Sequence, residues 1–522
     1  MTILDTSAGL KVIPLGGMGE IGMNCLVLEQ RVSGEPDRLL IDCGVSFPFG
    51  DYGVDTYGPR LDYLLDQPAA LQGVVLTHAH EDHAGALVRL LLALEDELRS
   101  EQRRLPVWAP AYAIELVRLR LEETPRASQL VALRPTGPGQ RFGAGSFTVE
   151  PIRVTHSMVD STALAIDTVV GKVLHTGDFK LDSGPADGEL TDVARLGRLG
   201  DGGVRLLLSD STNVLEPGAS GSEADAAEAL YAVIGSANRR AVVGLFASNL
   251  HRLHAVGEAA RRHGRKLCLL GRSLHVHSTI GLRLGRLDWP SDLLISAELA
   301  SRLPANQVVY AVTGTQGEPR AALRRLASDR HGDLRLEPGD TVVLSSRVIP
   351  GNERAVQCLV GDLLGLGVQL RSRTTDPRLH VSGHGHREEL RKMLSLVRPE
   401  AFIPLHGTPL HLQHHAALAR QVGVGQVLVL RDGEVAHLTV EGIGMATPVP
   451  VGKVAMAAGI ELDDGVLQQR RILGRCGVVF VVVATGSGHG GVSVAVKVKG
   501  LPLADEIVSE TTRAARLAVT GK

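Results

Sequence analysis

The 522 residues exceed what a single core holds and predict two to four domains. Hydrophobic residues make up 44% and charged residues 21%, which excludes a disordered chain, and the net charge of −2 excludes a wholly basic nucleic-acid binder while allowing a local cationic groove. Aromatic residues at 3% leave few platforms for base stacking, and five cysteines without a C-x-x-C pair exclude a disulfide framework and a thiolate zinc site.

The first block of predicted elements alternates short strands with helices. Residues 1–10 have neither the basic nor the apolar stretch of a secretory signal, and no apolar run reaches the roughly 18 residues that cross a bilayer, so we expect a soluble, cytoplasmic protein. A helix is expected over 84–98. Strands are expected at 11–15, 25–28, 39–43, 73–77, 147–154, 163–168, 173–176 and 204–208.

A second α/β block follows the break at residues 216–222, where Ser222 is a good N-cap for a helix that runs to residue 234. Residues 379–440 again carry predicted strands and histidine-rich turns and are expected to belong with the first block, so the second block is expected to be an insertion. The end of the chain predicts strands at 477–484 and 491–499 and a helix over 504–519. Strands of the second block are expected at 242–246, 266–270, 308–312 and 341–345.

A histidine-rich turn follows the predicted strand 73–77. His78, His80, Asp82 and His83 lie within six positions, and imidazole nitrogen with carboxylate oxygen is a donor mixture that Zn²⁺ accepts. A strand end is a good place for such a site, because the sheet holds the backbone while the turn fans the side chains outward. The alternative is a solvated turn.

Further donors stand in the same setting, each at the end of an apolar run. They are His156, Asp178 and His406. A single tetrahedral ion needs four ligands and a pair of ions needs more, so these three predict the rest of a metal cluster. A lone histidine at a strand end is more often structural.

These residues resemble a known family. The order His78-x-His80-x-Asp82-His83, His156-Ser157, His175-Thr176-Gly177-Asp178-Phe179 and His406-Gly407 is similar to the metallo-β-lactamase superfamily, and most closely to the ribonuclease J family of beta-CASP ribonucleases. The similarity covers residues 10–440. Other stretches that carry it are Gly16-Gly17-Met18-Gly19, Leu40-Ile41-Asp42-Cys43-Gly44, Asp210-Ser211-Thr212-Asn213, Ala247-Ser248-Asn249, Gly314-Thr315-Gln316-Gly317, Ile349-Pro350-Gly351-Asn352 and Ser382-Gly383-His384.

The resemblance implies an α/β fold: a metallo-β-lactamase αββα sandwich with an inserted α/β beta-CASP domain and a small α+β C-terminal unit. The implied domains are residues 1–215 and 356–445 for the metallo-β-lactamase domain, 216–355 for the insertion and 446–522 for the C-terminal unit. That unit is shorter than is usual in the family, where it assists dimerisation. A homodimer or higher oligomer is still expected, with other RNA-decay proteins as further partners.

The resemblance also implies two Zn²⁺ ions, with Mn²⁺ or Mg²⁺ as alternatives. His78, His80 and His156 would hold one ion, Asp82, His83 and His406 the other, and Asp178 would bridge them. Asp82 would also orient the water that attacks a phosphodiester. His384, paired with Asp210, would protonate the leaving oxygen.

The implied substrate is RNA with a 5′-monophosphate, cut by 5′-to-3′ exonuclease and endonuclease activity in RNA decay and maturation. The implied phosphate and sugar contacts are Ser248, His251, Arg252, Gly314, Thr315, Gln316, Ser382, Gly383 and His386. Three alternatives stay open: a DNA nuclease, a small-ester or lactam hydrolase with the same metal site, and a non-catalytic RNA-binding subunit of a decay complex.

Overall fold

A computed structural model describes residues 9–48, 53–484, 493–499, 501 and 504–520 of the chain. Contacts divide the chain into two compact units, one made of residues 1–46 and 58–452 and the other of residues 47–57 and 453–522. The larger unit contains three sheets and every residue that the sequence predicted for the site.

The first sheet has eight strands in the order β21-β20-β1-β2-β3-β5-β6-β7. β2 and β3 form a hairpin because Ser33 and Gly34 both adopt positive φ, the turn whose twist matches that of two paired strands. From β3 to β7 the pairing is parallel. The strands are β1 (Leu10–Gly16), β2 (Cys25–Val32), β3 (Glu35–Ile41), β5 (Leu71–Val75), β6 (Leu105–Ala109), β7 (Val131–Pro135), β20 (Val435–Leu438) and β21 (Ile443–Ala446).

The second sheet has seven strands in the order β19-β18-β12-β11-β10-β9-β8. Its Phe147 and Ile403 share one core with Leu26 and Val75 of the first sheet, so the two sheets pack face to face. β18 pairs in parallel with β12, which returns the chain to the first block after the insertion, as predicted. The strands are β8 (Phe142–Ala144), β9 (Phe147–Arg153), β10 (Thr162–Thr168), β11 (Gly171–His175), β12 (Leu206–Asp210), β18 (Ala401–Leu405) and β19 (Gln426–Val427).

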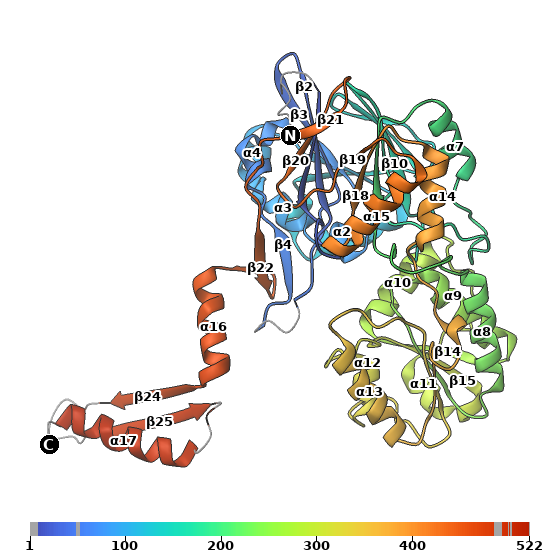
Figure 1. Cartoon of the computed structure of the whole chain (residues 1–522). Coiled ribbons are helices and arrows are strands. Elements are labelled where there is room, and N and C mark those ends of the chain that lie inside the picture. The colour runs from blue at the N-terminus through green and yellow to red at the C-terminus, as the bar shows by residue number, and fades with distance from the viewer. Residues whose placement is uncertain (1–8, 49–52, 485–492, 500, 502–503, 521–522) are drawn as a thin grey trace. The chain divides into compact units, whose positions relative to one another are not determined.

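Helices cover the outer face of each sheet (Figure 1). Leu90 and Ile114 pack with Val74 of the first sheet, and Leu394 and Leu418 belong to the core that includes strands of the second sheet. The helices are α3 (Leu87–Ala93), α5 (Ala111–Glu122), α7 (Val193–Asp201), α14 (Arg387–Val397) and α15 (Pro409–Val422). The predicted αββα sandwich is confirmed.

The inserted block is built on a five-stranded parallel sheet in the order β14-β15-β13-β16-β17. β13, β15 and β16 are buried at every position, which explains their near-continuous apolar runs. Strand β17 lies beyond residue 355, so the sheet continues past the predicted end of the insertion. The elements are α8 (Glu223–Ser236), β13 (Ala241–Gly244), α9 (Leu250–Arg262), β14 (Lys266–Leu270), α10 (Arg272–Arg283), α11 (Ala297–Arg302), β15 (Val308–Val312), α12 (Ala322–Ala327), β16 (Thr341–Leu344), α13 (Glu353–Gly365) and β17 (Gln369–Ser372).

The helix predicted over 84–98 is wrong as a single element, because α2 (Glu81–Ala84), α3 and α4 (Glu95–Ser100) replace it. The N–H of Ala86 donates to Cys43 O at 2.8 Å, and the carbonyl of Asp82 accepts from Asn24 N at 2.9 Å instead of from Ala86. These long-range bonds end the helical ladder at Ala84. They also fix the short helix that carries Asp82 and His83.

Among its described residues, the smaller unit contains two small sheets and two helices. The two strands and the helix predicted at the end of the chain are present, although residues 491–492 lie outside the described residues. In the larger unit, Ser222 caps α8 as predicted. In the described part of the chain no helix is long and apolar enough to span a membrane. The elements are β4 (Thr56–Pro59), β22 (Lys453–Ala457), β23 (Ile460–Leu462), α16 (Asp464–Cys476), β24 (Val478–Ala484), β25 (Ser493–Lys499) and α17 (Ala504–Thr520).

Candidate metal centre

The turn after β5 is held by the loop after β3. Asp42 accepts hydrogen bonds from the N–H of Thr77 at 2.8 Å and from its hydroxyl at 2.9 Å. Gly44 passes so close to the turn that a Cβ atom there would lie 1.7 Å from Asp82 O, so only glycine fits. The loop and the turn therefore form one rigid platform for the residues from His78 to His83.

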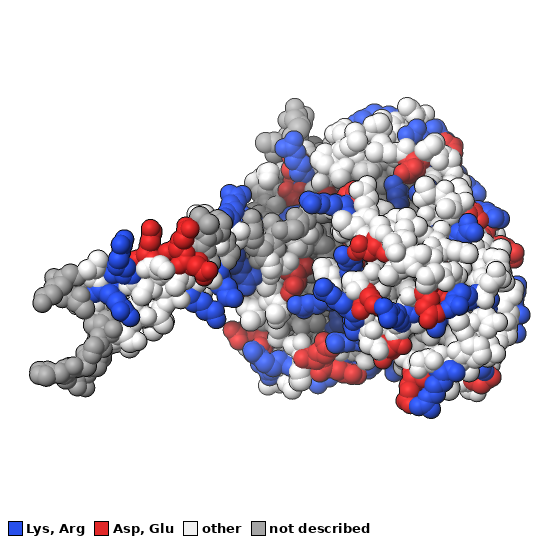
Figure 2. All heavy atoms as spheres, turned by 90° about the horizontal axis from the view of Figure 1, so that it is seen from below, with Lys and Arg blue, Asp and Glu red and all other residues white. Residues whose placement is uncertain are grey.

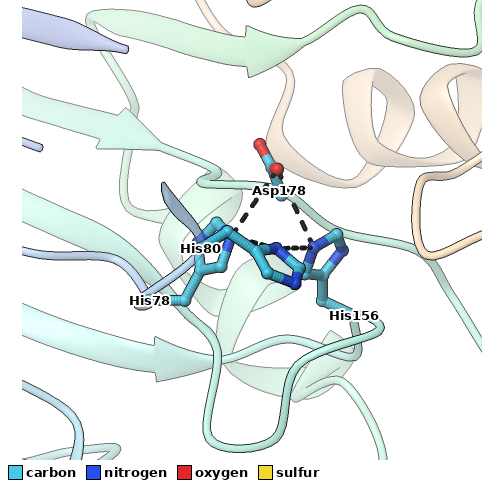
Figure 3. Close-up of side chains that lie close together, drawn as sticks. All are labelled: His78, His80, His156 and Asp178. Carbon is cyan, nitrogen blue, oxygen red and sulfur yellow. Dashed lines mark hydrogen bonds and ion pairs between the residues drawn. The ribbon is translucent and has the colours of Figure 1, made fainter. Parts of the chain in front are cut away.

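Four side chains of the predicted set form a first group of donors (Figure 3). His80 Nδ1 lies 3.0 Å from His78 Nε2 and 3.2 Å from His156 Nε2. Asp178 Oδ2 lies 3.7 Å from His78 Nε2 and 3.8 Å from His156 Nε2. A tetrahedral zinc ion with bonds of about 2.0–2.1 Å separates its donors by about 3.3 Å, which is close to these spacings.

A second group adjoins the first and shares Asp178 with it. Asp178 Oδ2 lies 3.1 Å from His83 Nε2, and Asp178 Oδ1 lies 2.9 Å from His406 Nδ1. Asp82 Oδ2 lies 3.4 Å from His406 Nε2 and 3.7 Å from His83 Nε2. The structure thus brings all seven predicted side chains together, from four separate segments of the chain.

The donor set fits a pair of divalent cations. His406 Nε2 is buried and has no hydrogen-bond partner among the described residues, although it faces a carboxylate. Buried polar atoms are rarely left unpaired, so an atom in this position indicates a bound ion. His406 also adopts φ of +51°, a conformation that costs energy in a non-glycine residue and is often found at functional sites.

The charges of the group support this reading. Burial lowers the pKa of His78 and of His156 well below the ordinary value, so both are neutral and able to donate a lone pair. Burial also opposes charge on Asp178, but His83 and His406 outweigh it and hold the pKa of this carboxyl well below its usual range. Burial alone would lower the pKa of His406. The carboxylates of Asp178 and Asp82 outweigh the effect of burial and raise this pKa to about 10. Protons on His83 and His406 thus occupy positions that cations would take when they bind.

His384 and Asp210 form a pair beside these groups. His384 Nδ1 donates to Asp210 Oδ2 at 2.8 Å, and His384 Nε2 lies 3.9 Å from Asp178 Oδ2. Burial lowers the pKa of His384, but the carboxylates of Asp210 and Asp178 outweigh it and raise it above the ordinary value. Asp210 also accepts from the N–H and hydroxyl of Thr212, so its orientation is fixed.

The structure contradicts the prediction that Arg252 contacts the substrate, because this side chain is buried. Its side chain is 1% exposed and pairs with Glu223, which is 2% exposed. The guanidinium also donates to Leu379 O at 3.1 Å and to the hydroxyl of Ser345. All of these partners lie within the fold, so Arg252 ties the inserted block to the segment that leads to His384 and has no donor for RNA.

Gly314, Thr315 and Gln316 are also buried, in the inserted block. Gln316 Nε2 donates to Arg347 O at 2.9 Å and its Oε1 accepts from Ile349 N at 2.8 Å, so its amide stabilises a loop. His251 lines a pocket that both acidic and basic side chains face, among them Asp187, Asp288 and Arg286.

Of the remaining predicted contacts, Gly383 and Ser248 touch donor histidines, and Ser382 and His386 have other partners. Gly383 O accepts from His156 Nδ1 at 2.8 Å, and a Cβ atom at Gly383 would lie 2.7 Å from Ser157 Oγ. Ser382 Oγ accepts from Asn213 Nδ2 at 2.7 Å, and His386 caps α14. Ser248 Oγ lies 3.2 Å from His80 Nε2. Figure 2 shows acidic and basic side chains interspersed on the face in view, without a single basic stripe.

Two residues that the sequence analysis assigned no role support the site. Asp42 accepts from His83 Nδ1 at 2.8 Å as well as from Thr77. A signal for it exists, because Asp42 stands directly after the buried end of β3, much as Asp178 follows shortly after β11. Arg347 donates to Asn213 and Glu216 from the inserted block, and nothing in its local sequence indicates this.

Comparison with known families matches three parts of the chain. Residues 19–230 match the metallo-beta-lactamase superfamily. Residues 238–363 match the family described as ribonuclease J, beta-CASP domain, and residues 374–429 match the Zn-dependent metallo-hydrolase RNA specificity domain. These matches follow the order of the two sandwich parts and the insertion between them.

The chain is also similar to known proteins along most of its length. It is 37% identical to Ribonuclease J of Thermus thermophilus over 483 residues, which covers 91% of this chain and 82% of the relative. It is 38% identical to Ribonuclease J of Mycolicibacterium smegmatis over 488 residues, covering 92% and 84%. The solved structure of a protein of unknown function from Enterococcus faecalis matches this chain with a TM-score of 0.57 at 16% identity. The match covers 83% of this chain and 100% of the other protein, and it supports the fold alone.

Proposed function

This chain belongs to the ribonuclease J family of metal-dependent ribonucleases, and we propose that it hydrolyses RNA with a pair of divalent cations, both from a 5′-monophosphorylated end and internally. The observation that carries the proposal is the convergence of seven donors into two adjoining groups that share Asp178. We propose zinc as the resident metal, because histidine nitrogen with carboxylate oxygen at these spacings suits it.

In this proposal His78, His80 and His156 hold one cation, and Asp82, His83 and His406 hold the other, with Asp178 between them. Two divalent cations there would acidify water near neutral pH and offset charge on a phosphate oxygen. The side chain of Asp82 is 25% exposed, against 3% for Asp178, so solvent can reach it and it can orient the attacking water.

His384 supplies the proton for the leaving group. Asp210 holds Nδ1, so Nε2 carries the transferable proton on the side that faces the donor groups. The water gives up one proton to the solvent as its oxygen forms a bond to phosphorus, the P–O3′ bond breaks, and the 3′ oxygen takes the proton from Nε2. The downstream product then has a 5′-monophosphate, which is the end required for the next exonucleolytic step.

The test uses purified full-length protein with Zn²⁺ or Mn²⁺ and RNA labelled at the 3′ end. We expect a ladder that shortens from a 5′-monophosphorylated end and a few internal cuts on 5′-triphosphorylated RNA. A double variant Asp82→Ala and His83→Ala should bind RNA without cutting it. Intact RNA with every metal would refute the proposal, and equal cutting of a matched DNA strand would refute the specificity for RNA.

We also propose that the chain works as a homodimer or higher oligomer with RNA as its substrate. Light scattering with the full chain tests the first part, and a monomer at micromolar concentration would contradict it.

A further inference from the structure

The histidines of the two donor groups each need one ring nitrogen without a proton, since only a bare lone pair binds a metal. Which nitrogen is bare depends on the hydrogen bond that the other one makes. His156 Nδ1 faces Gly383 O at 2.8 Å and His83 Nδ1 faces Asp42 Oδ2 at 2.8 Å. A carbonyl and a carboxylate can only accept, so both rings keep the proton on Nδ1 and present Nε2 to the groups.

His78 follows the same pattern through a hydroxyl. Its Nδ1 lies 3.0 Å from Thr77 Oγ1, and that hydroxyl already donates its proton to Asp42 at 2.9 Å. Thr77 therefore accepts from His78. The partners of these three rings all come from segments of the sandwich or from the segment that returns to it.

His80 has the opposite orientation. Its Nδ1 faces His78 and His156, while its Nε2 lies 3.2 Å from Ser248 Oγ. Ser248 belongs to the inserted block, in the loop between β13 and α9. That loop is firmly held, because Ser248 O accepts from Leu250 N at 3.0 Å and Asn249 caps α9 by accepting from Arg252 N at 2.9 Å.

We propose that Ser248 is a positioning residue for the metal ligand His80, a role different from the RNA contact that the sequence predicts. Ser248 Oγ accepts the Nε2 proton of His80, which leaves the lone pair on Nδ1 and directs it at the first donor group. The inserted block thereby completes the support of a ligand that belongs to the sandwich. This inference deepens the proposed function and rests on its assignment of His80 as a ligand.

The test is zinc affinity, measured on the full-length apo-protein by competition with a chromophoric chelator. Loss of the outer partner of a ligating histidine typically weakens metal affinity about 10–100-fold, so Ser248→Ala should weaken one of two zinc sites by that factor. Ser248→Thr keeps the hydroxyl and should restore most of the affinity. Ser278→Ala is the matched control, because the Ser278 hydroxyl is also in the inserted block but bonds to His275 O in its own helix.

A second readout is the Nε2 proton of His80, observed by nitrogen-correlated NMR of the histidine rings in the zinc-loaded protein. We expect slow exchange of this proton with solvent in the parent, where Ser248 accepts it, and faster exchange in Ser248→Ala. Zinc affinity of Ser248→Ala within twofold of the parent would overturn the inference and leave the proposed function standing. If Ser248→Ala binds zinc more weakly but the unmodified protein does not cut RNA, the proposed function is overturned and the inference stands.

Discussion

Replacing Arg252 by alanine separates a structural role from a role in binding RNA. The side chains of Arg252 and Glu223 are 1% and 2% exposed and meet at 2.9 Å. Removing one partner leaves a buried carboxylate without its counter-charge, which costs about 3–5 kcal/mol. At roughly 2–4 °C per kcal/mol, the unfolding midpoint of the part that contains the pair should fall by about 10 °C.

The assay is thermal unfolding of the full chain, followed by tryptophan fluorescence and circular dichroism. A double variant, Arg252→Met with Glu223→Leu, removes both charges and should recover most of the midpoint, because two well-packed apolar side chains replace the buried pair. The reasoning is refuted if Arg252→Ala melts within 2 °C of the parent while its affinity for RNA falls about tenfold, a change of 1.4 kcal/mol in binding.

The remaining predictions concern pH, catalysis and metal removal. Burial opposes charge on Glu29, but its bonds from Lys11, Tyr63 and Arg38 lower its pKa to about 2. Because this is below the ordinary value of 4.5, the ion pairs stabilise the fold above about pH 4.5 and the contribution is lost as pH falls toward 2. Denaturant unfolding between pH 5 and pH 3 should therefore show a loss about 2 kcal/mol larger in the parent than in Glu29→Gln, and equal losses would contradict this. His384→Ala should lower the rate of RNA cleavage about 10²–10⁴-fold with zinc stoichiometry unchanged, measured by single-turnover cleavage and metal analysis; a variant that has lost zinc would show that His384 is a ligand. Asp210→Asn should keep zinc as well and lower the same rate, since it no longer stabilises the charged imidazole, and an unchanged rate would exclude the pairing as a catalytic device. Chelation should lower the melting temperature, and zinc at 100 times its dissociation constant should restore about 2.7 kcal/mol of stability, whereas an unchanged melting curve would contradict a metal bound to the folded state.

The strand ends made much of the site predictable. His156, Asp178 and His406 each follow an apolar run, and the sheets bring these ends to one edge, as the pattern indicates. The αββα sandwich could also be predicted from the sequence, because alternating apolar runs and helices leave few ways to bury both faces of two sheets.

Other features depend on contacts between distant residues and left no local pattern. The break after Ala84 arises from bonds to Cys43 and Asn24, which helix propensity does not reveal. The predicted RNA contact at Arg252 failed for a related reason, since an arginine at a helix start looks the same whether it faces solvent or a buried glutamate. The end of the insertion was placed too early because β17 is short and half-exposed, with little hydrophobic signal.

The pairing of β12 with β18 also sets an order of events during synthesis. Asp210 lies beside Leu405 in the sheet, and His406 follows at once. A nascent polypeptide that has not yet reached this strand carries the first donor group but lacks His406. The ribosome must therefore translate the whole insertion before the second donor group can form.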